Sequence, residues 1–204
     1  MSTQPVKNVI IAGIGGQGNI VASHLLAEAA LMEGNKVKLA ETYGAATRGG
    51  SVLSHVRIGE AWSARTPEGQ ADIIIALEPL EGLRVALKFL RPGGWVLVNN
   101  HPIYPFDVTI GNMIYPDLDT IKEALKSLGG KVFIVDATRL ALQAGSERSV
   151  NIVMLGCLFG TGILDLSEGS LLQTMALRWS KKISEINQRA FELGRQEVRG
   201  TRTN

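Results

Sequence analysis

The chain has 204 residues, a formal net charge of +2 and one cysteine, and 45% of its residues are hydrophobic. This length holds one domain with a substantial core and is short for two. The small charge argues against nucleic acid as a partner, and a lone cysteine excludes both an internal disulfide and an iron–sulfur cluster held by this chain alone.

The ends of the chain and its apolar runs indicate a cytoplasmic protein. The first residues are polar and the apolar run after Pro5 is short and interrupted by glycine, unlike a secretory signal. No stretch approaches the roughly 18 apolar residues that would span a bilayer. The single cysteine, Cys157, lies in the apolar segment "NIVMLGCLFG", and we expect it to be a buried packing residue.

Apolar periodicity gives the expected elements of the first third. Strands are predicted over 6–12, 37–41 and 51–59, and a helix over 17–32. In the strand over 51–59, Leu53, His55 and Arg57 form one of two alternating faces. We expect that face to be partly wet and the strand to lie near the sheet edge, with an antiparallel orientation open to it.

Strand and helix patterns alternate through the remaining sequence. We expect strands over 71–77, 95–100 and 131–137 and helices over 79–90, 120–130, 138–144, 149–159 and 168–193. The segment 106–116 predicts a short strand or hairpin, Asp117 or Asp119 a helix cap, and Trp179 a break in the last helix. The order predicts an α/β fold, with a Rossmann-like, mostly parallel sheet and helices on both faces. We expect one domain over 1–204, with a frayed tail over 195–204.

The stretch "IAGIGGQGNI" joins the first strand to the first helix through glycines. Gly13, Gly15 and Gly18 fit the G-x-G-x-x-G spacing of dinucleotide-binding proteins. Such a turn exposes backbone N–H groups at a helix N-terminus, where an anion is favoured. A phosphate cradle and a tight strand–helix junction are both open on this motif alone.

A nicotinamide or flavin dehydrogenase also needs an acidic residue about 20 positions further on, and Glu41 lies there. Against that function, the remaining chain is used to complete one sheet, which leaves no substrate domain. Gly16 and Gln17 also depart from what a dinucleotide site requires. The dense segment "ETYGAATRGGS" follows, in which Arg48 is a candidate to bind a phosphate or carboxylate, or to pair internally with Glu41 or Asp72.

Four segments in this order carry a resemblance: "GIGGQGNIVASHLLAEAA", "ETYGAATRGGSVLSHVRIG", "ADIIIALEPLEGLR" and "NIVMLGCLFG". Together they resemble the gamma subunit of 2-oxoacid:ferredoxin oxidoreductases over about residues 6–194. The segments "ALEPLEGLR" and "NQRAFELG" are most similar to the small beta subunit of the indolepyruvate enzymes.

The resemblance implies CoA-dependent oxidative decarboxylation of a 2-oxoacid, with electrons passed to ferredoxin. It places thiamine diphosphate, magnesium and iron–sulfur clusters on thiamine-binding alpha- and beta-type subunits and a ferredoxin-like subunit. This chain would hold no cofactor alone, would be inactive alone, and would support assembly and the coenzyme A site. A homodimer of the isolated chain stays open, as do a free-standing dehydrogenase and an assembly protein without a ligand.

The resemblance also suggests where coenzyme A would bind. Our hypothesis is that Gly15, Gly16, Gln17 and Gly18 present N–H donors, with Gly13 and Glu41 nearby. A facing loop would contain Tyr43, Thr47, Arg48 and Gly49, with Arg48 on a phosphate or a partner carboxylate.

Other polar and aromatic residues give weaker expectations. We expect neither His55 nor His101 to bind a metal, since no cysteine or acid accompanies them at ligand spacing. Glu78 and Glu81 stand where a strand meets a helix, either at a ligand-binding edge or as a cap and a partner of Arg84. Core packing is the first expectation for Trp62 and Trp179, with a subunit interface as the alternative.

Overall fold

The computed structural model describes residues 5–44, 50–104, 108 and 114–201. Six strands form one sheet in the order β2-β3-β1-β4-β5-β6. The strands are β1 (Lys7–Ile14), β2 (Val37–Tyr43), β3 (Ser51–Ile58), β4 (Ala71–Ala76), β5 (Leu90–Asn99) and β6 (Lys131–Val135). The helices are α1 (Asn19–Met32), α2 (Pro79–Phe89), α4 (Leu118–Ser127), α5 (Ala137–Ala144), α6 (Val150–Gly160), α7 (Glu168–Arg178) and α8 (Lys181–Thr201), with the 3-10 turn η1 (Glu147–Ser149).

Strand directions confirm the expected α/β fold. β1, β4, β5 and β6 are neighbours in parallel, as expected for strands joined through helices. β3 lies between β1 and β2 and is antiparallel to both. The strand that alternates with period two is therefore second from the edge, as its pattern predicted.

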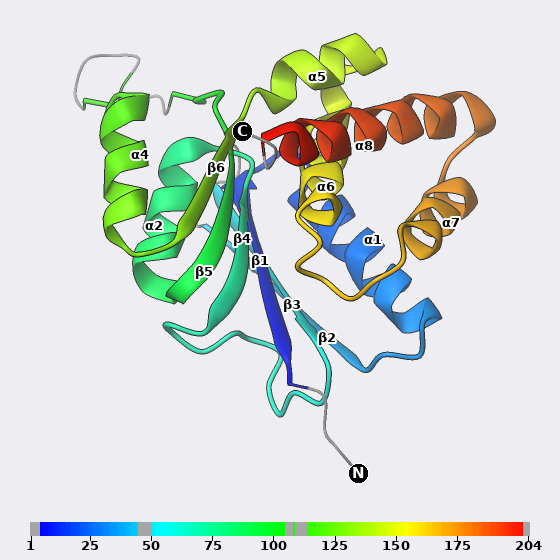
Figure 1. The fold of residues 1–204 in the computed structure, drawn as a ribbon, viewed down its shortest axis with the longest axis horizontal. Helices are drawn as coiled ribbons and strands as arrows, with labels where there is room; N and C mark the ends of the chain where they lie inside the picture. The colour runs from blue at the N-terminus through cyan, green and yellow to red at the C-terminus, as the bar shows by residue number, and fades with distance from the viewer. Residues whose placement is uncertain (1–4, 45–49, 105–107, 109–113, 202–204) are drawn as a thin grey trace.

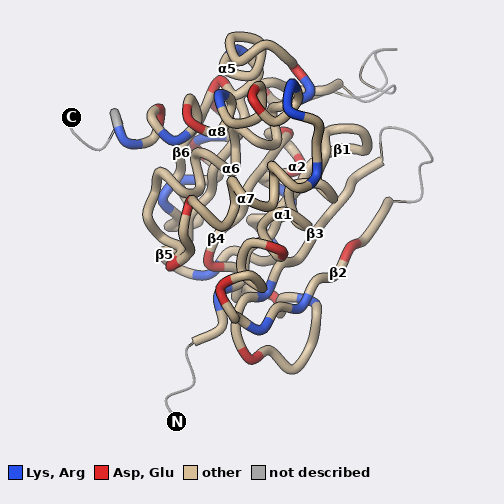
Figure 2. Tube along the Cα trace, turned by 90° about the vertical axis from the view of Figure 1, so that its right-hand side faces the viewer, with Lys and Arg blue, Asp and Glu red and all other residues tan. Residues whose placement is uncertain are grey.

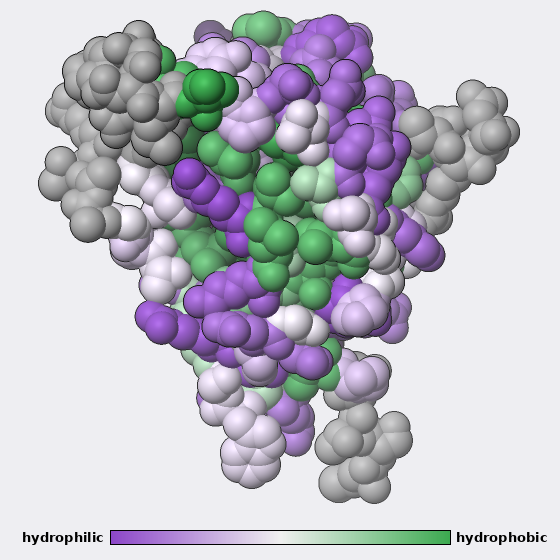
Figure 3. Space-filling model, turned by 90° about the vertical axis from the view of Figure 1, so that its left-hand side faces the viewer, coloured by the Kyte–Doolittle hydropathy of each residue, from purple (hydrophilic) through white to green (hydrophobic). Residues whose placement is uncertain are grey.

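Helices cover both faces of the sheet (Figure 1). Alternate side chains of β1 enter two cores: Val9 and Ile11 pack on the α1 and α6 side, and Ile10 and Ala12 on the α2 side. Figure 3 views the molecule from the side of α2 and α4, where hydrophobic side chains gather in the middle of a hydrophilic surround. From the opposite side, acidic and basic residues are interspersed (Figure 2), as on an ordinary solvated surface.

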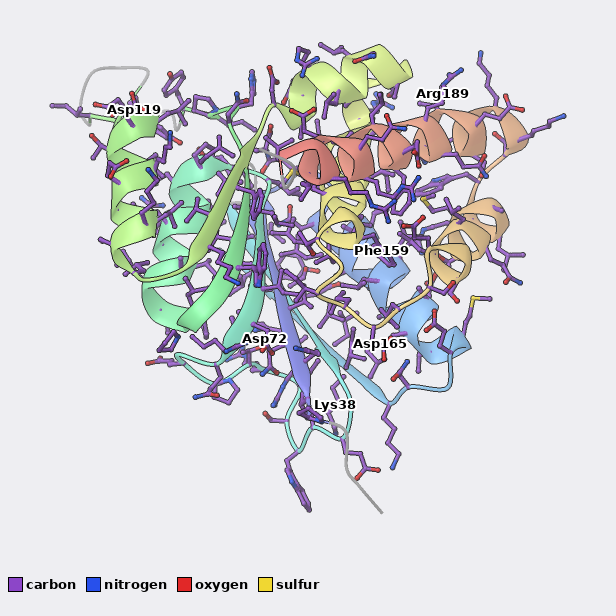
Figure 4. The ribbon with its side chains drawn as sticks, viewed as in Figure 1. Lys38, Asp72, Asp119, Phe159, Asp165 and Arg189 are labelled. Atoms are coloured by element: carbon purple, nitrogen blue, oxygen red, sulfur yellow. The ribbon has the colours of Figure 1, made fainter. Side chains whose placement is uncertain are left out.

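The C-terminal helices pack unusually closely. A Cβ added at Gly194 would lie 2.0 Å from the carbonyl oxygen of Val153, so α6 and α8 cross backbone against backbone. Cys157 of α6 is buried as expected, and burial raises the pKa of its thiol above the usual range. Phe159 of α6 lies beneath α8 (Figure 4), where the centre of its ring is 5.6 Å from that of Phe191.

The last helical segment breaks as predicted, since α7 ends at Arg178 and α8 begins at Lys181. The expected frayed tail is not observed over 195–201, because α8 continues to Thr201. Arg195 pairs with Glu168 at 2.9 Å and with Glu192 at 2.7 Å, and Val198 is buried, which holds the final turns in place.

The segment before α4 was expected to contain a hairpin and a helix cap. Asp117 caps α4 by accepting from the Thr120 N–H at 2.7 Å. The part of the expected 106–116 hairpin that can be described, residues 114–116, is not a strand, and most of its other residues lie outside the described ranges.

Within the described residues, no helix is both long and apolar enough to cross a membrane.

Two side-chain predictions were wrong. His55 is 2% exposed rather than wet, because Phe89 stacks edge-on against its ring and the Thr66 N–H donates to its Nδ1 atom at 3.3 Å. Trp62 is 100% exposed rather than packed in the core. Trp179, in contrast, packs against the larger core as expected.

Candidate functional site

The carboxyl ends of β1, β4 and β5 meet at one edge of the sheet. β1 leads through α1 toward β2 and β3, whereas β4 leads through α2 toward β5 and β6. The chain therefore winds in opposite directions from β1 and β4, and ligands of open α/β sheets bind at such a switch point. The glycine turn, Gly15 to Gly18, lies here between β1 and α1.

Gln17 joins the ends of two strands. Its Oε1 accepts from the Ile14 N–H at 2.7 Å and its Nε2 donates to the Leu77 carbonyl at 2.9 Å. The same carbonyl accepts from Asn99 Nδ2 at 3.3 Å, and Asn99 Oδ1 accepts from the Ala137 N–H at 3.1 Å. Two side-chain amides thus fix β1, β4, β5 and the start of α5 relative to one another.

Gly18 brings α1 against α6. It adopts a left-handed conformation with φ 82°, and its carbonyl accepts from Asn151 Nδ2 at 3.0 Å. A Cβ at this position would lie 2.5 Å from the same nitrogen. Any side chain here would displace Asn151, so the turn needs glycine for both its conformation and its packing.

Only part of the expected donor set is free to bind a ligand. The N–H of Gly15 donates to the Gly50 carbonyl at 2.9 Å, and that of Gln17 to the Ile14 carbonyl at 3.2 Å. Among the described residues, the N–H groups of Gly16 and Gly18 have no acceptor. α1 also has no side-chain cap and no acidic residue in its first turn. The positive end of its dipole therefore faces this turn uncompensated.

A cavity of about 370 Å³ opens beside the glycine turn. Its lining comes from the turn, the end of β5 and the loop after it, the start of α5, η1 and the start of α6: Gly16, Gln17, Asn99, His101, Ile103, Thr138, Glu147, Arg148 and Val150. Sequence reasoning did not identify Arg148 or Thr138, because they come from segments distant from the motif. The asparagine at the carboxyl end of the buried strand "WVLVN" was the one local signal available.

Glu41 and Tyr43 lie on β2 and do not line the cavity, and Glu41 contacts α1. Glu41 Oε1 lies 3.1 Å from His24 Nε2, and Glu41 Oε2 accepts from the Tyr43 hydroxyl at 2.5 Å. This hydrogen bond raises the pKa of Tyr43. A dinucleotide-binding fold requires its acidic residue on the strand beside the glycine turn. Glu41 does not lie there, because β3 separates β2 from β1.

The structure describes only Tyr43 of the residues proposed for the facing loop. Thr47, Arg48 and Gly49 lie outside the described residues. Of the two internal partners suggested for Arg48, Glu41 is bonded as above, and Asp72 pairs with Arg91 at 2.7 Å.

Glu78 and Glu81 make contacts that stabilise the start of α2. Glu78 Oε2 accepts from the Glu81 N–H at 2.8 Å, which caps α2, and Glu81 pairs with Arg84 at 2.6 Å. Both contacts confirm the structural interpretation of these residues. The other Glu78 oxygen accepts from the Tyr115 hydroxyl, and burial raises the pKa of Glu78.

Metal binding finds no support in the described residues. They contain no group of three His, Cys, Asp or Glu side chains that could hold an ion. His55 is buried against Phe89, and His101 lines the cavity.

These features define a class of protein: an α/β domain whose uncapped glycine turn meets a small cavity at the switch point of the sheet. Comparison with known proteins then identifies the family. The model of the pyruvate ferredoxin/flavodoxin oxidoreductase family matches residues 8–197, and the chain belongs to this family.

Individual relatives refine the comparison. The chain is 41% identical to the indolepyruvate oxidoreductase subunit IorB of Thermococcus kodakarensis, over 92% of this chain and 93% of that protein. The keto/oxoacid ferredoxin oxidoreductase gamma subunit of Geobacter sulfurreducens has the same fold, with a TM-score of 0.68, 25% identity, and coverage of 94% and 98%.

A longer chain contains the same fold. The 2-oxoglutarate:ferredoxin oxidoreductase of Magnetococcus marinus matches with a TM-score of 0.74 and 22% identity, over 97% of this chain and 32% of that one. The resemblance inferred from four sequence segments is thereby confirmed. The chain is a gamma-type subunit of a 2-oxoacid:ferredoxin oxidoreductase.

Proposed function

We propose that this chain forms part of the coenzyme A site of its complex, supports assembly of the complex, and is inactive alone. The observation that carries the proposal is the uncapped start of α1 beside a cavity that also contains Arg148. Backbone N–H groups at a helix start and a guanidinium are the donors that phosphate groups prefer.

We propose fewer phosphate donors than the hypothesis from the sequence did. Because Gly15 and Gln17 already donate within the chain, Gly16 and Gly18 become the proposed phosphate donors. Gln17 then acts by positioning the turn through its two side-chain hydrogen bonds. Gly13 lies beneath the turn in β1, and Tyr43, Thr47, Arg48 and Gly49 stay the proposed facing loop, with Glu41 orienting Tyr43.

The size of the cavity favours a shared site. Ligand pockets usually measure about 300–1,000 Å³, and this one, at about 370 Å³, lies near the lower limit. It suits a phosphate and its immediate neighbours rather than a whole coenzyme. We therefore propose that a partner subunit supplies the remaining walls. The Magnetococcus enzyme was solved with coenzyme A bound, which makes this ligand our first candidate.

The redox chemistry belongs to the partners in this proposal. Thiamine diphosphate with magnesium, and iron–sulfur clusters, supply decarboxylation and electron transfer from other subunits. The one cysteine of this chain is buried in α6, and a cluster commonly takes four thiolates. Ferredoxin or a ferredoxin-like subunit would receive the electrons. Since the relative at 41% identity is an indolepyruvate subunit, we propose an aryl 2-oxoacid as the substrate of the complex.

Calorimetry on the reconstituted complex tests the proposal. Coenzyme A is titrated into the partner subunits with and without this chain, and then with Arg148→Ala. Loss of a charge-assisted hydrogen bond should weaken binding about tenfold or more. The matched control is Arg139→Ala, an exposed arginine of α5 that is absent from the cavity lining and should change nothing.

Other outcomes would replace the proposal. Equal coenzyme A affinity without this chain would make it an assembly protein with no ligand. Arg48→Ala is tested in the same way, and its assigned role fails if the coenzyme A KM, turnover and assembly are all unchanged. Absorbance of a bound nicotinamide or flavin in the purified chain would instead support the dehydrogenase.

A further inference from the structure

The loop that joins β3 to β4, residues 59–70, lies at the end of the sheet opposite the glycine turn (Figure 1). At its centre Trp62 is 100% exposed. Tryptophan is highly buried on average in folded proteins and is strongly enriched among the residues that anchor interfaces. A fully exposed tryptophan therefore needs an explanation.

Buried Arg57 holds this loop in one conformation. Its Nη1 donates to the carbonyl and to the hydroxyl of Ser63, both at 2.9 Å, and to the Arg65 carbonyl at 3.3 Å. Its Nε donates to Asn8 Oδ1 at 2.8 Å, which ties the guanidinium to β1. The chain on the C-terminal side of Trp62 is thus fixed to the sheet.

Further contacts fix the two ends of the same segment. Ala61 is buried, and Lys36 Nζ donates to Glu60 Oε1 at 2.5 Å. Thr66 is buried, and its N–H donates to the ring of His55. Trp62 therefore stands out from a segment that is anchored on both sides. Such an anchor loses little conformational entropy on binding.

None of the described helices makes extensive contacts with β2 and β3 on the face beside this loop. Lys38, Ala40 and Thr42 of β2 lie across from Arg57, His55 and Leu53 of β3 on the α2 face of the sheet. Of the helices in the described residues, α1 packs on β2 and β3, and it lies on the opposite face. Ala40, Thr42 and Leu53 are only half-buried, so small and apolar side chains line this face along β2 and β3, from the Trp62 end toward the glycine turn.

The surroundings of Trp62 carry uncompensated positive charge. Exposed Lys38 and Arg65 take part in none of the ion pairs among the described residues. Nearby carboxylates are already paired, Glu60 with Lys36 and Asp72 with Arg91. Figure 4 places Lys38 and Asp72 at the lower end of the sheet. A binding partner would need carboxylates to neutralise the two free cations.

We infer that Trp62, flanked by Lys38 and Arg65, docks this chain into an apolar cavity rimmed by carboxylates on a partner subunit of the oxidoreductase complex. The inference rests on the proposed role in assembly. A second copy of the chain fits less well, because a two-fold axis through this surface would set the same cations against each other. The docking surface also lies at the opposite end of the sheet from the cavity, so one chain can bind ligand and partner independently.

Binding of the partner subunit to this chain, measured by surface plasmon resonance, tests the docking surface. Trp62→Ala should weaken the complex at least thirtyfold, as for an interface hot spot, by raising the dissociation rate. The matched control is Leu177→Ala on α7, which removes an apolar side chain that is 78% exposed away from this loop. It should leave the affinity unchanged.

Two further measurements separate docking from altered folding. Lys38→Glu and Arg65→Glu should each lower the association rate and reduce its dependence on salt. Iodide should quench the emission of Trp62 in the isolated chain and lose access to it in the complex. The difference between the wild type and Trp62→Phe isolates that signal from Trp95 and Trp179.

The results that overturn the inference are distinct from those that overturn the proposed function. Wild-type affinity of Trp62→Ala overturns the docking surface alone. A Trp62-dependent dimer in sedimentation, or Trp62-dependent binding to vesicles of anionic lipid with unchanged partner affinity, also overturns it. If the wild-type chain fails to bind the partner subunit, the role in assembly falls as well.

Discussion

The two ends of the sheet use buried polar side chains in opposite ways. At the carboxyl end, Gln17 and Asn99 turn their amides inward onto the Leu77 carbonyl, and a cavity remains between the elements they join. At the amino end, Arg57 and His55 also hydrogen-bond to backbone, but they hold a loop whose central residue, Trp62, points into solvent.

This contrast separates two kinds of recognition. A concave site with free N–H donors suits a small anionic ligand. A fixed, exposed anchor beside two cations that have no ion-pair partner among the described residues suits a protein surface. If the chain binds both coenzyme A and a partner subunit, as proposed, the fold keeps the two sites at opposite ends of β1. The comparison can be tested by weakening each end separately.

Acid should weaken the amino end most. Burial, with nearby Arg65 and Arg57, lowers the pKa of His55 from 6.5 to about 4. Between these two pH values the unfolded chain binds a proton that the folded chain excludes, so stability is lost as pH falls from about 6.5 to about 4. At about 1.4 kcal/mol per pKa unit, the total loss is about 3 kcal/mol. Urea unfolding at several pH values measures it.

A variant that cannot titrate provides the control for this effect. His55→Gln keeps a side-chain acceptor for the Thr66 N–H. Its unfolding free energy should decline less steeply over the same pH range, by about the amount that His55 contributes. An identical pH dependence in the two proteins would show that other groups cause the loss.

The carboxyl end should respond to Gly18→Ala more than to Gly16→Ala. Both glycines have positive φ, 82° and 100°, so alanine costs about 1–2 kcal/mol of backbone strain at either position. At Gly18 the new Cβ would also displace Asn151, whereas no atom lies within 4 Å at Gly16. We expect a further loss of about 1 kcal/mol at Gly18, from the broken hydrogen bond. Equal losses by chemical denaturation would contradict the role of Asn151.

Local pattern was sufficient to predict most elements of the fold. The apolar run "ADIIIAL" predicted the buried strand β4, and the alternation over 51–59 predicted the strand β3 near the sheet edge, with an antiparallel orientation left open. The glycine spacing likewise located the turn before α1. These features depend on neighbours in the chain, which sequence periodicity records.

Long-range contacts account for what the sequence did not predict. The polar face of β3 suggested exposure, but the loop 59–70 covers His55, and nothing local to the strand encodes that. Trp62 was expected in the core because apolar side chains usually are, yet Arg57 fixes the backbone beside it to the sheet and the Trp62 side chain is left exposed. In the same way, Arg148 reaches the cavity through the packing of α6 on α1 at Gly18 and Asn151, 133 residues apart.

The smallest expected effect, that of Trp62→Ala on stability, tests whether Trp62 is an interface anchor or a residue that stabilises the fold. Trp62 has no buried surface in the isolated chain, so Trp62→Ala should change the free energy of unfolding by less than about 0.5 kcal/mol. Arg57→Met leaves Asn8 Oδ1 and the Ser63 carbonyl without their donor and should cost about 2 kcal/mol. Urea denaturation of the two variants measures both. A large loss with Trp62→Ala would mean that its ring packs against the chain, and that a stability role, rather than docking, explains its presence in the loop.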